Sequence, residues 1–235
     1  MKNIYYIIAL LILSSSQIVL AQLEGQKFIS GTASVNFSNT DPDLEKSSNN
    51  YGYNFDIGLG KFKTSTRASG WNLSTSLSGS KQNLTTYTNG NPTTREKNGI
   101  NGFGVGVGRF WQFYKHFNEK VGIFAGPDIN VRYNNSKTYE TTSNGSALVE
   151  NQINALTLSA GLSAGLYYKL SQNWWITGSI ALSDFASVNY TDLKSGVETD
   201  NYTTRQKTYN YQFSPSFRFP VVGFGVRYFF WHQKK

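Results

Sequence analysis

Side chains able to carry out nucleophilic or acid–base chemistry are scarce in this 235-residue sequence. It has no Cys and two His, which excludes disulfides, thiolate metal sites and a cysteine nucleophile. His116 falls in a short predicted turn and His232 in the C-terminal tail, and neither adjoins a Ser and an acid suited to a triad. An aspartate dyad is the alternative, although Asp56 and Asp128 are expected near Arg residues. We therefore predict no enzyme activity, no cofactor and no metal.

A glycine-rich run is the second candidate for chemistry. Residues 102–108 read Gly-Phe-Gly-Val-Gly-Val-Gly, which lacks the G-x-G-x-x-G spacing of a dinucleotide loop and is not followed by Lys-Ser or Lys-Thr. Glycine at every second position leaves one face of a strand free of side chains. We expect this face to make room for bulky groups from neighbouring strands.

Alternation with a period of two residues runs through most of the chain and defines the elements that carry these residues. Between Tyr51 and Leu59, for example, every second residue is aromatic or aliphatic, and the others are Gly, Asn or Asp. Such a pattern is typical of strands with one apolar face. Eight segments show it, within residues 29–37, 51–60, 71–78, 102–108, 121–133, 156–168, 174–183 and 209–230. We interpret a change of phase around 215–220 as a bulge, and ten strands is the alternative.

The connections between these segments alternate in length. Residues 39–50, 81–98, 135–150 and 184–206 are long and polar, whereas 63–70, 113–119 and 169–173 are short. Long loops at one end and short turns at the other are typical of transmembrane β-barrels. The sequence therefore predicts an eight-stranded antiparallel up-and-down barrel. A soluble ligand-binding barrel with the apolar face inward is the less favoured alternative.

Composition and the N-terminus point to export. Charged residues make up 15% of the chain and the mean hydropathy is −0.39, which excludes a bundle of membrane helices. Residues 1–21 have the features of a signal peptide, with Lys2, an apolar stretch from Ile4 to Leu13 and a small-residue cleavage site ending at Ala21. Residues 22–235 are then one barrel domain, and nucleic acid is excluded as a partner.

Tryptophan and tyrosine are placed as two belts at opposite rims. With both termini periplasmic, the tryptophans gather at the periplasmic rim: Trp71, Trp111, Trp174, Trp175 and Trp231. A set of tyrosines gathers at the extracellular rim: Tyr51, Tyr53, Tyr133, Tyr209 and Tyr211. These rings prefer the lipid–water interface because each has an apolar body and a polar tip.

Charged residues are also unevenly distributed between the interior and the two ends of the predicted barrel. Asp56, Asp128, Arg132 and Arg218 fall on the polar phase, and a mid-depth Arg facing lipid costs about 2–4 kcal/mol, so we expect them inside the barrel. There they would form a plug of salt bridges and hydrogen bonds, or alternatively a charged gate. The short-turn end is strongly basic, and we hypothesise that it contacts lipid phosphates. Its basic residues are Lys27, Lys61, Lys63, Arg67, Arg109, Lys115, Lys120, Lys169, Arg227, Lys234 and Lys235.

The signal peptide, the eight segments and the ending Phe224-Gly225-Val226-Arg227-Tyr228-Phe229-Phe230 resemble the small outer-membrane β-barrel proteins of Bacteroidota. These porin-family proteins are related in fold to barrel domains of the OmpA/OmpX type. The resemblance covers the whole mature chain as a pattern rather than as a motif. It implies a place in the outer membrane, with membrane lipids and the barrel-assembly machinery as partners.

The favoured function is an integral outer-membrane barrel with a structural or surface-interaction role and no enzyme activity. A narrow pore for ions or small solutes is the main alternative, and a lipid-modifying or proteolytic enzyme is a weaker one. The sequence identifies no extracellular ligand.

Overall fold

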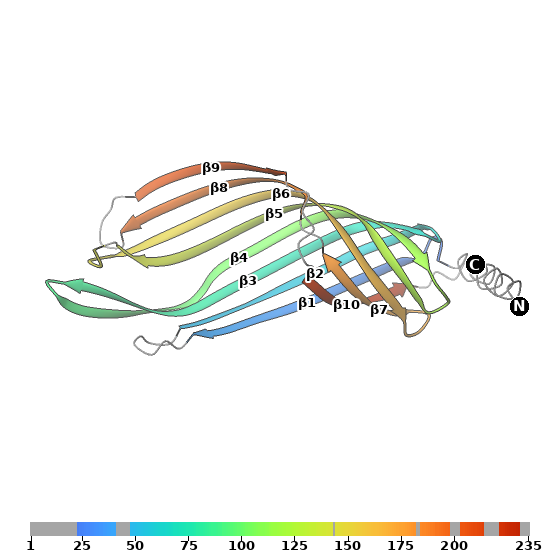
Figure 1. Ribbon diagram of the computed structural model, residues 1–235, viewed down its shortest axis with the longest axis horizontal. Helices are drawn as coiled ribbons and strands as arrows, with labels where there is room; N and C mark the ends of the chain where they lie inside the picture. The colour runs from blue at the N-terminus through green and yellow to red at the C-terminus, as the bar shows by residue number, and fades with distance from the viewer. Residues whose placement is uncertain are drawn as a thin grey trace, which may run out of the picture.

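The computed structural model describes residues 23–40, 48–142, 144–181, 184–197, 203–213 and 221–230. Within these ranges the chain forms one antiparallel sheet, drawn in Figure 1. Its ten strands are β1 (Lys27–Thr40), β2 (Ser48–Thr64), β3 (Arg67–Thr88), β4 (Asn91–His116), β5 (Val121–Thr141), β6 (Leu148–Lys169), β7 (Trp174–Ala181), β8 (Ala186–Val197), β9 (Thr203–Phe213) and β10 (Val221–Phe230). The prediction of an all-β antiparallel fold is confirmed. The described residues contain no helix long and apolar enough to cross a membrane.

Eight of the strands close into a ring through backbone hydrogen bonds. From β1 to β6 each strand pairs with the next one in sequence, β6 pairs with β7, β7 with β10, and β10 returns to β1. The closing β1–β10 pairing runs from Lys27↔Phe230 to Gly31↔Val226. The ring thus has the predicted number of strands, and the whole sheet has the number given by the alternative.

The two additional strands extend the sheet beyond the ring. β7 and β8 follow each other along one edge of β6, with β7 on residues 163–169 and β8 on residues 149–160. β9 then pairs with β8. Among the described residues β9 has no second neighbour, and β1 pairs only with β2 beyond Gly31. Figure 1 shows β9 and the far half of β1 on opposite sides of the sheet. The predicted bulge at 215–220 lies outside the described residues.

The prediction of four long loops is wrong for most of their residues, because the strands continue into them. β3 and β4, for example, pair as far as Thr88↔Asn91 around an Asn89-Gly90 turn. Both turn residues have positive φ, the conformation that favours Asn-Gly in two-residue hairpins. Most residues of this hairpin are polar, so its sequence gives no alternating pattern. Backbone pairing and side-chain contacts stabilise the hairpin, for example the 3.0 Å hydrogen bond between Thr85 Oγ1 and Thr94 Oγ1.

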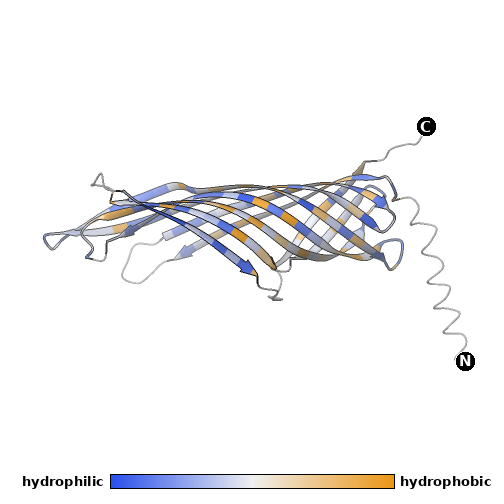
Figure 2. Cartoon of the chain, turned by 90° about the horizontal axis from the view of Figure 1, so that it is seen from above, coloured by the Kyte–Doolittle hydropathy of each residue, from blue (hydrophilic) through white to orange (hydrophobic). Residues whose placement is uncertain are grey.

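Hydrophobic and hydrophilic residues follow one another along the strands (Figure 2), and the two faces of the sheet differ in the way that this alternation predicts. Aliphatic and aromatic residues of the alternating segments are exposed on the outer face. The residues between them face the inside of the ring. The only buried hydrophobic cluster of the described chain lies inside the ring, at the end near the first residues of β1 and the last residues of β10.

Candidate functional site

The outer surface of the ring carries a continuous apolar band. On β6, all outward residues from Leu156 to Tyr168 are Leu, Ala or Tyr, and Leu158 and Leu166 are 47% and 56% exposed. This stretch of twelve residue steps is about 40 Å long along the strand. At the tilt of about 40° that is common in closed sheets, it covers a height of about 30 Å. That height is close to the hydrocarbon thickness of a bilayer, about 25–30 Å.

Aromatic rings border this band at the end where β1 begins and β10 ends. Trp71, Trp111 and Trp174 all point outward near the ends of β3, β4 and β7. Trp174 packs against Tyr228 of β10, with ring centroids 4.8 Å apart. The assignment of Trp175 to the same outward belt is wrong, because neighbouring residues of a strand point to opposite faces and Trp175 is 1% exposed inside the ring. Trp231 lies outside the described residues.

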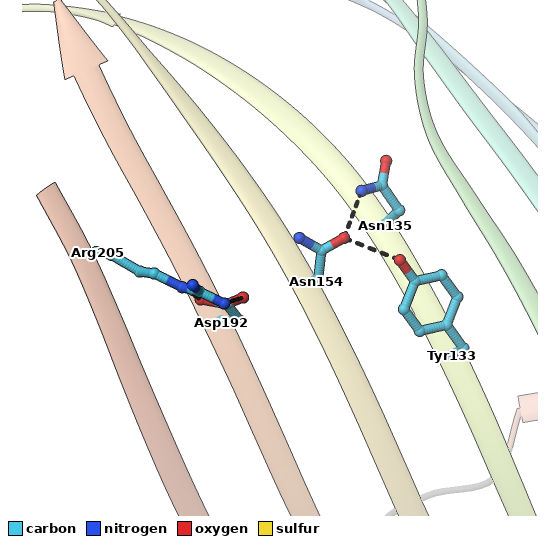
Figure 3. Close-up of polar contacts among 5 residues, drawn as sticks. All are labelled: Tyr133, Asn135, Asn154, Asp192 and Arg205. Atoms are coloured by element: carbon cyan, nitrogen blue, oxygen red, sulfur yellow. Dashed lines mark hydrogen bonds and ion pairs between the residues drawn. The ribbon is translucent and has the colours of Figure 1, made fainter. Parts of the chain in front are cut away.

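Tyrosines border the other side of the band. Tyr51, Tyr53, Tyr209 and Tyr211 are exposed on the outer face, and Tyr133 is half-buried there. Tyr133 shows the orientation of such a ring most clearly: its hydroxyl donates to Asn154 Oδ1 at 2.9 Å, and Asn135 Nδ2 donates to the same oxygen at 2.7 Å (Figure 3). The ring lies opposite Leu156 and 6.0 Å from the ring of Phe103, while its hydroxyl reaches a polar contact, the arrangement favoured at an interface.

Beyond the tyrosines the outer face becomes charged. Arg205 of β9 donates two hydrogen bonds of 2.7 Å to the Asp192 carboxylate of β8 (Figure 3). Lys137 and Glu150 form an ion pair at 2.9 Å between β5 and β6. Arg205 holds the pKa of Asp192 below its ordinary value of 3.8, mainly through the hydrogen bonds. The apolar band thus ends within a few residues, at a charged and hydrated surface.

Inside the ring, an aromatic plug fills the end where β1 begins and β10 ends. Trp175 stacks on Tyr167 with ring centroids 4.4 Å apart and contacts Phe229 at the same separation. Each ring strand contributes to the plug, which consists of Phe28, Phe62, Ala68, Phe110, Tyr114, Phe124, Tyr167, Trp175 and Phe229 together with Leu23. Glycines make space for these rings: a Cβ on Gly165 would lie 2.5 Å from the Phe124 ring. The predicted interior plug of salt bridges and hydrogen bonds did not include this aromatic packing.

Arg227 is buried within the aromatic plug. Its guanidinium lies 4.2 Å from the centre of the Phe28 ring and donates to the Tyr114 hydroxyl and to Gln112 Oε1, the latter at 3.2 Å. The prediction that Arg227 belongs to the basic outer rim is therefore wrong. No carboxylate forms an ion pair with it in the described part of the chain, so aromatic faces and neutral acceptors surround its charge.

A polar network occupies the ring interior next to the aromatic plug. Asn72 donates to Asn130 at 3.0 Å, and Asn130 donates to Asp128 at 2.6 Å. Arg132 donates to Ser76 at 3.0 Å. Three predicted interior charges, on Asp56, Asp128 and Arg132, are half-buried on the inward phase, but no ion pair joins them to one another. Arg218 lies outside the described residues.

The glycines of residues 102–108 face this network. A Cβ on Gly108 would collide with the side-chain oxygens of Asn72 and Asn130, and one on Gly104 with those of Ser76 and Asn134. Their place in the structure agrees with the expected role, which is to leave space for side chains from the two neighbouring strands.

His116 lies at the edge of the aromatic plug rather than in an exposed turn. Its Nδ1 contacts the Tyr167 hydroxyl and its Nε2 lies 2.9 Å from the Ser65 carbonyl oxygen. In the described part of the chain, no Ser–acid pair contacts its ring nitrogens. Within the described residues, no group of three or more His, Asp or Glu side chains could hold a metal ion.

The aromatic plug is the main feature that the sequence interpretation missed. A usable signal exists: Phe110-Trp111, Tyr167-Tyr168, Trp174-Trp175 and Phe229-Phe230 are adjacent aromatic pairs at strand ends. In a strand, one member of such a pair must face each side of the sheet. Adjacent aromatic residues near a ring end therefore indicate both an outer belt and an inner plug.

Comparison with protein families gives no matching family model, and comparison with curated proteins gives no match.

Proposed function

We propose that the protein is an integral outer-membrane β-barrel protein of the kind found in Bacteroidota, with a structural or surface-interaction role and no enzyme activity. The observation that carries this proposal is the orientation of the closed ring, apolar outside and polar or aromatic inside. A soluble protein gains free energy by burying apolar side chains. Here the long rows of Leu, Val and Ile are the exposed ones, which is favourable only next to hydrocarbon.

Two further features support a place across a membrane. Where the ring is closed, each strand has hydrogen-bonded neighbours on both sides, as a span through lipid requires; the closing β1–β10 pairing covers five residue pairs and the β10–β7 pairing eight. The apolar band is bordered by indole rings on one side and by tyrosines followed by ion pairs on the other. Both borders match the preferences of the two lipid–water interfaces.

The interior favours a closed barrel over a narrow pore. The aromatic plug receives side chains from all eight ring strands, and Phe62, Tyr167 and Phe229 are fully buried in it. An eight-stranded barrel has an interior just wide enough for side chains. The surfaces then available to partners are the lipid-facing band and the extended hairpins.

Folding into lipid tests the membrane proposal. The mature chain, diluted from urea into phosphatidylcholine vesicles, should acquire β-structure and a heat-modifiable mobility on SDS gels, with faster migration before boiling. Dilution into buffer without lipid or detergent is the control and should give aggregation. A folded, monodisperse protein in plain buffer would overturn the proposal.

Topology can be tested on the same protein because the chain has no Cys. Asn91→Cys places a thiol at the tip of the long β3–β4 hairpin, and Glu119→Cys places one in the short β4–β5 turn. With both termini periplasmic, a membrane-impermeant maleimide added to intact cells should label Asn91→Cys and reach Glu119→Cys only after lysis. The reverse labelling pattern would contradict the orientation.

A further inference from the structure

Four basic residues gather on the outer face of β1 to β4, at the end of the ring where β1 begins. This basic patch consists of Lys27, Lys61, Arg67 and Arg109. Lys27, Lys61 and Arg67 are exposed, and no ion pair involves any of the four in the part of the chain that the structure describes. With adjacent strands about 4.8 Å apart, the basic patch extends over about 15 Å.

Two of these charges are placed directly opposite each other. Lys27 of β1 is the register partner of Lys61 of β2, and neither has a carboxylate as its cross-strand neighbour on this face. Like charges at directly opposite positions of a sheet are destabilising. An anion bound between the two ammonium groups would remove this repulsion, so the pair indicates a ligand with negative charge.

Arg109 is held by indole rings at the same end. It is the register partner of Trp71, and its guanidinium carbon lies 4.9 Å from the centre of the Trp71 ring and 5.8 Å from that of the Trp111 ring. Cation–π contacts cover the faces of a guanidinium but leave its N–H donors at the edge available. Those planar donors match the oxygens of a phosphate group.

The residues next to the basic patch indicate the kind of molecule that carries the phosphate group. The basic patch continues directly into the apolar band, since Ile29, Leu59 and Leu73 follow Lys27, Lys61 and Trp71 on the outward phase of their strands. A ligand on this surface therefore meets positive charge, then indole rings, then aliphatic side chains. An anionic headgroup followed by acyl chains has the complementary order.

We propose that the basic patch binds the phosphate headgroup of an anionic phospholipid in the leaflet that surrounds this end of the ring. The inference rests on the proposed membrane function and adds a lipid class and named contacts to it. Lys27 and Lys61 share one headgroup, while Arg109, fixed between Trp71 and Trp111, donates to phosphate oxygens at the level of the indole rings.

Quenching of tryptophan fluorescence by brominated lipids measures this selectivity. The full chain is folded into phosphatidylcholine vesicles that contain either brominated phosphatidylglycerol or brominated phosphatidylcholine, and the ratio of their apparent affinities is determined. Each basic side chain near an anionic lipid surface contributes about a fivefold preference. We expect the wild type to prefer phosphatidylglycerol at least about fivefold, with the preference reduced in 1 M salt.

Matched variants assign the preference to the basic patch. Lys61→Gln combined with Arg109→Gln should bring the ratio close to one, and Arg109→Lys alone should lower it only in part because the charge is kept. Lys194→Gln combined with Lys207→Gln removes the same charge at the far end and should leave the ratio unchanged. Each ratio is taken within one variant, so altered indole emission cancels.

Three results would overturn the lipid assignment: a wild-type ratio near one, a ratio that the Lys61/Arg109 double variant does not lower, or loss of the preference when inorganic phosphate replaces chloride at constant ionic strength. Quenching by neither brominated lipid is a different outcome, because it would contradict the membrane function itself. Equal quenching by both lipids would contradict only the headgroup site.

Discussion

Replacing Leu162 with Arg distinguishes a lipid-facing band from a water-facing one. Leu162 is 40% exposed on β6, six residues from Leu156 and six from Tyr168, at the middle of a long apolar stretch of the outer face. Six residues of strand span about 20 Å, so an Arg placed there lies about 15 Å in height from either border at a common tilt. Its charge is thus far from both interfaces.

The two environments predict different costs for this substitution. At the midplane of a bilayer an outward Arg costs about 2–4 kcal/mol, whereas a substitution on a water-exposed surface usually stays within about 0.5 kcal/mol. The membrane model therefore predicts that Leu162→Arg lowers the folding equilibrium constant by a factor of about 30 to 900. Leu170→Arg is the matched control, since Leu170 is 58% exposed just beyond the end of β6 and should cost at most about 1 kcal/mol.

The assay is equilibrium unfolding by urea of the chain folded in phosphatidylcholine vesicles, followed by tryptophan emission and by gel mobility. The difference between the two variants is the quantity that matters, because it cancels the general effect of a Leu→Arg change. If Leu162→Arg and Leu170→Arg destabilise the protein equally, the band does not face hydrocarbon and the reasoning fails.

Four further outcomes follow from the interior and the extended hairpins. Trp175→Ala should destabilise the protein by about 3–5 kcal/mol in urea unfolding, because it removes a fully buried ring from the aromatic plug. In planar bilayers the wild type should give no steady single-channel openings, and regular openings would contradict the closed interior. Gly126→Ala should reduce the heat-modifiable fraction, since its Cβ would overlap a backbone carbonyl, whereas Gly178→Ala, with only a leucine side chain at 3.6 Å, should be tolerated. Because Arg205 lowers the pKa of Asp192, the ion pair between them should protect the β8–β9 hairpin from amide exchange at neutral pH. This protection should be lost as the pH falls through the lowered pKa, below 3.8, and Asp192→Asn should show no such transition.

The parts of the fold that the sequence predicted are those where one face of a strand differs from the other. The stretch from Tyr51 to Leu59 has apolar and polar residues in strict alternation, and it lies within β2 with the expected face outward. A slip of one residue would reverse both faces, so the pattern determines orientation and register together.

The sequence did not reveal strands whose two faces are alike, nor aromatic residues on the inward face of a strand. Residues Asn83–Thr88 and Asn91–Glu96 are mostly polar and do not alternate, so only their pairing across the hairpin reveals them as strand. The aromatic plug was missed because its residues occupy the otherwise polar, inward phase. Most of them lie next to an outward apolar residue, so the two together read as a local break in the alternation. Arg227 was assigned to the rim from its distance to the C-terminus, whereas its side chain follows the inward phase between Val226 and Tyr228.

The short pairing between β1 and β10 has a consequence for how the protein assembles. These five pairs join residues about two hundred positions apart, while the β3–β4 hairpin pairs more than twenty residues locally. Local hairpins form early and long-range contacts late, because closing a long loop costs more conformational entropy before any contact forms. The sheet should therefore exist as an open, curved intermediate until the C-terminal strand is delivered, and a nascent chain that lacks residues 221–230 would present the free edge of β1 to other molecules.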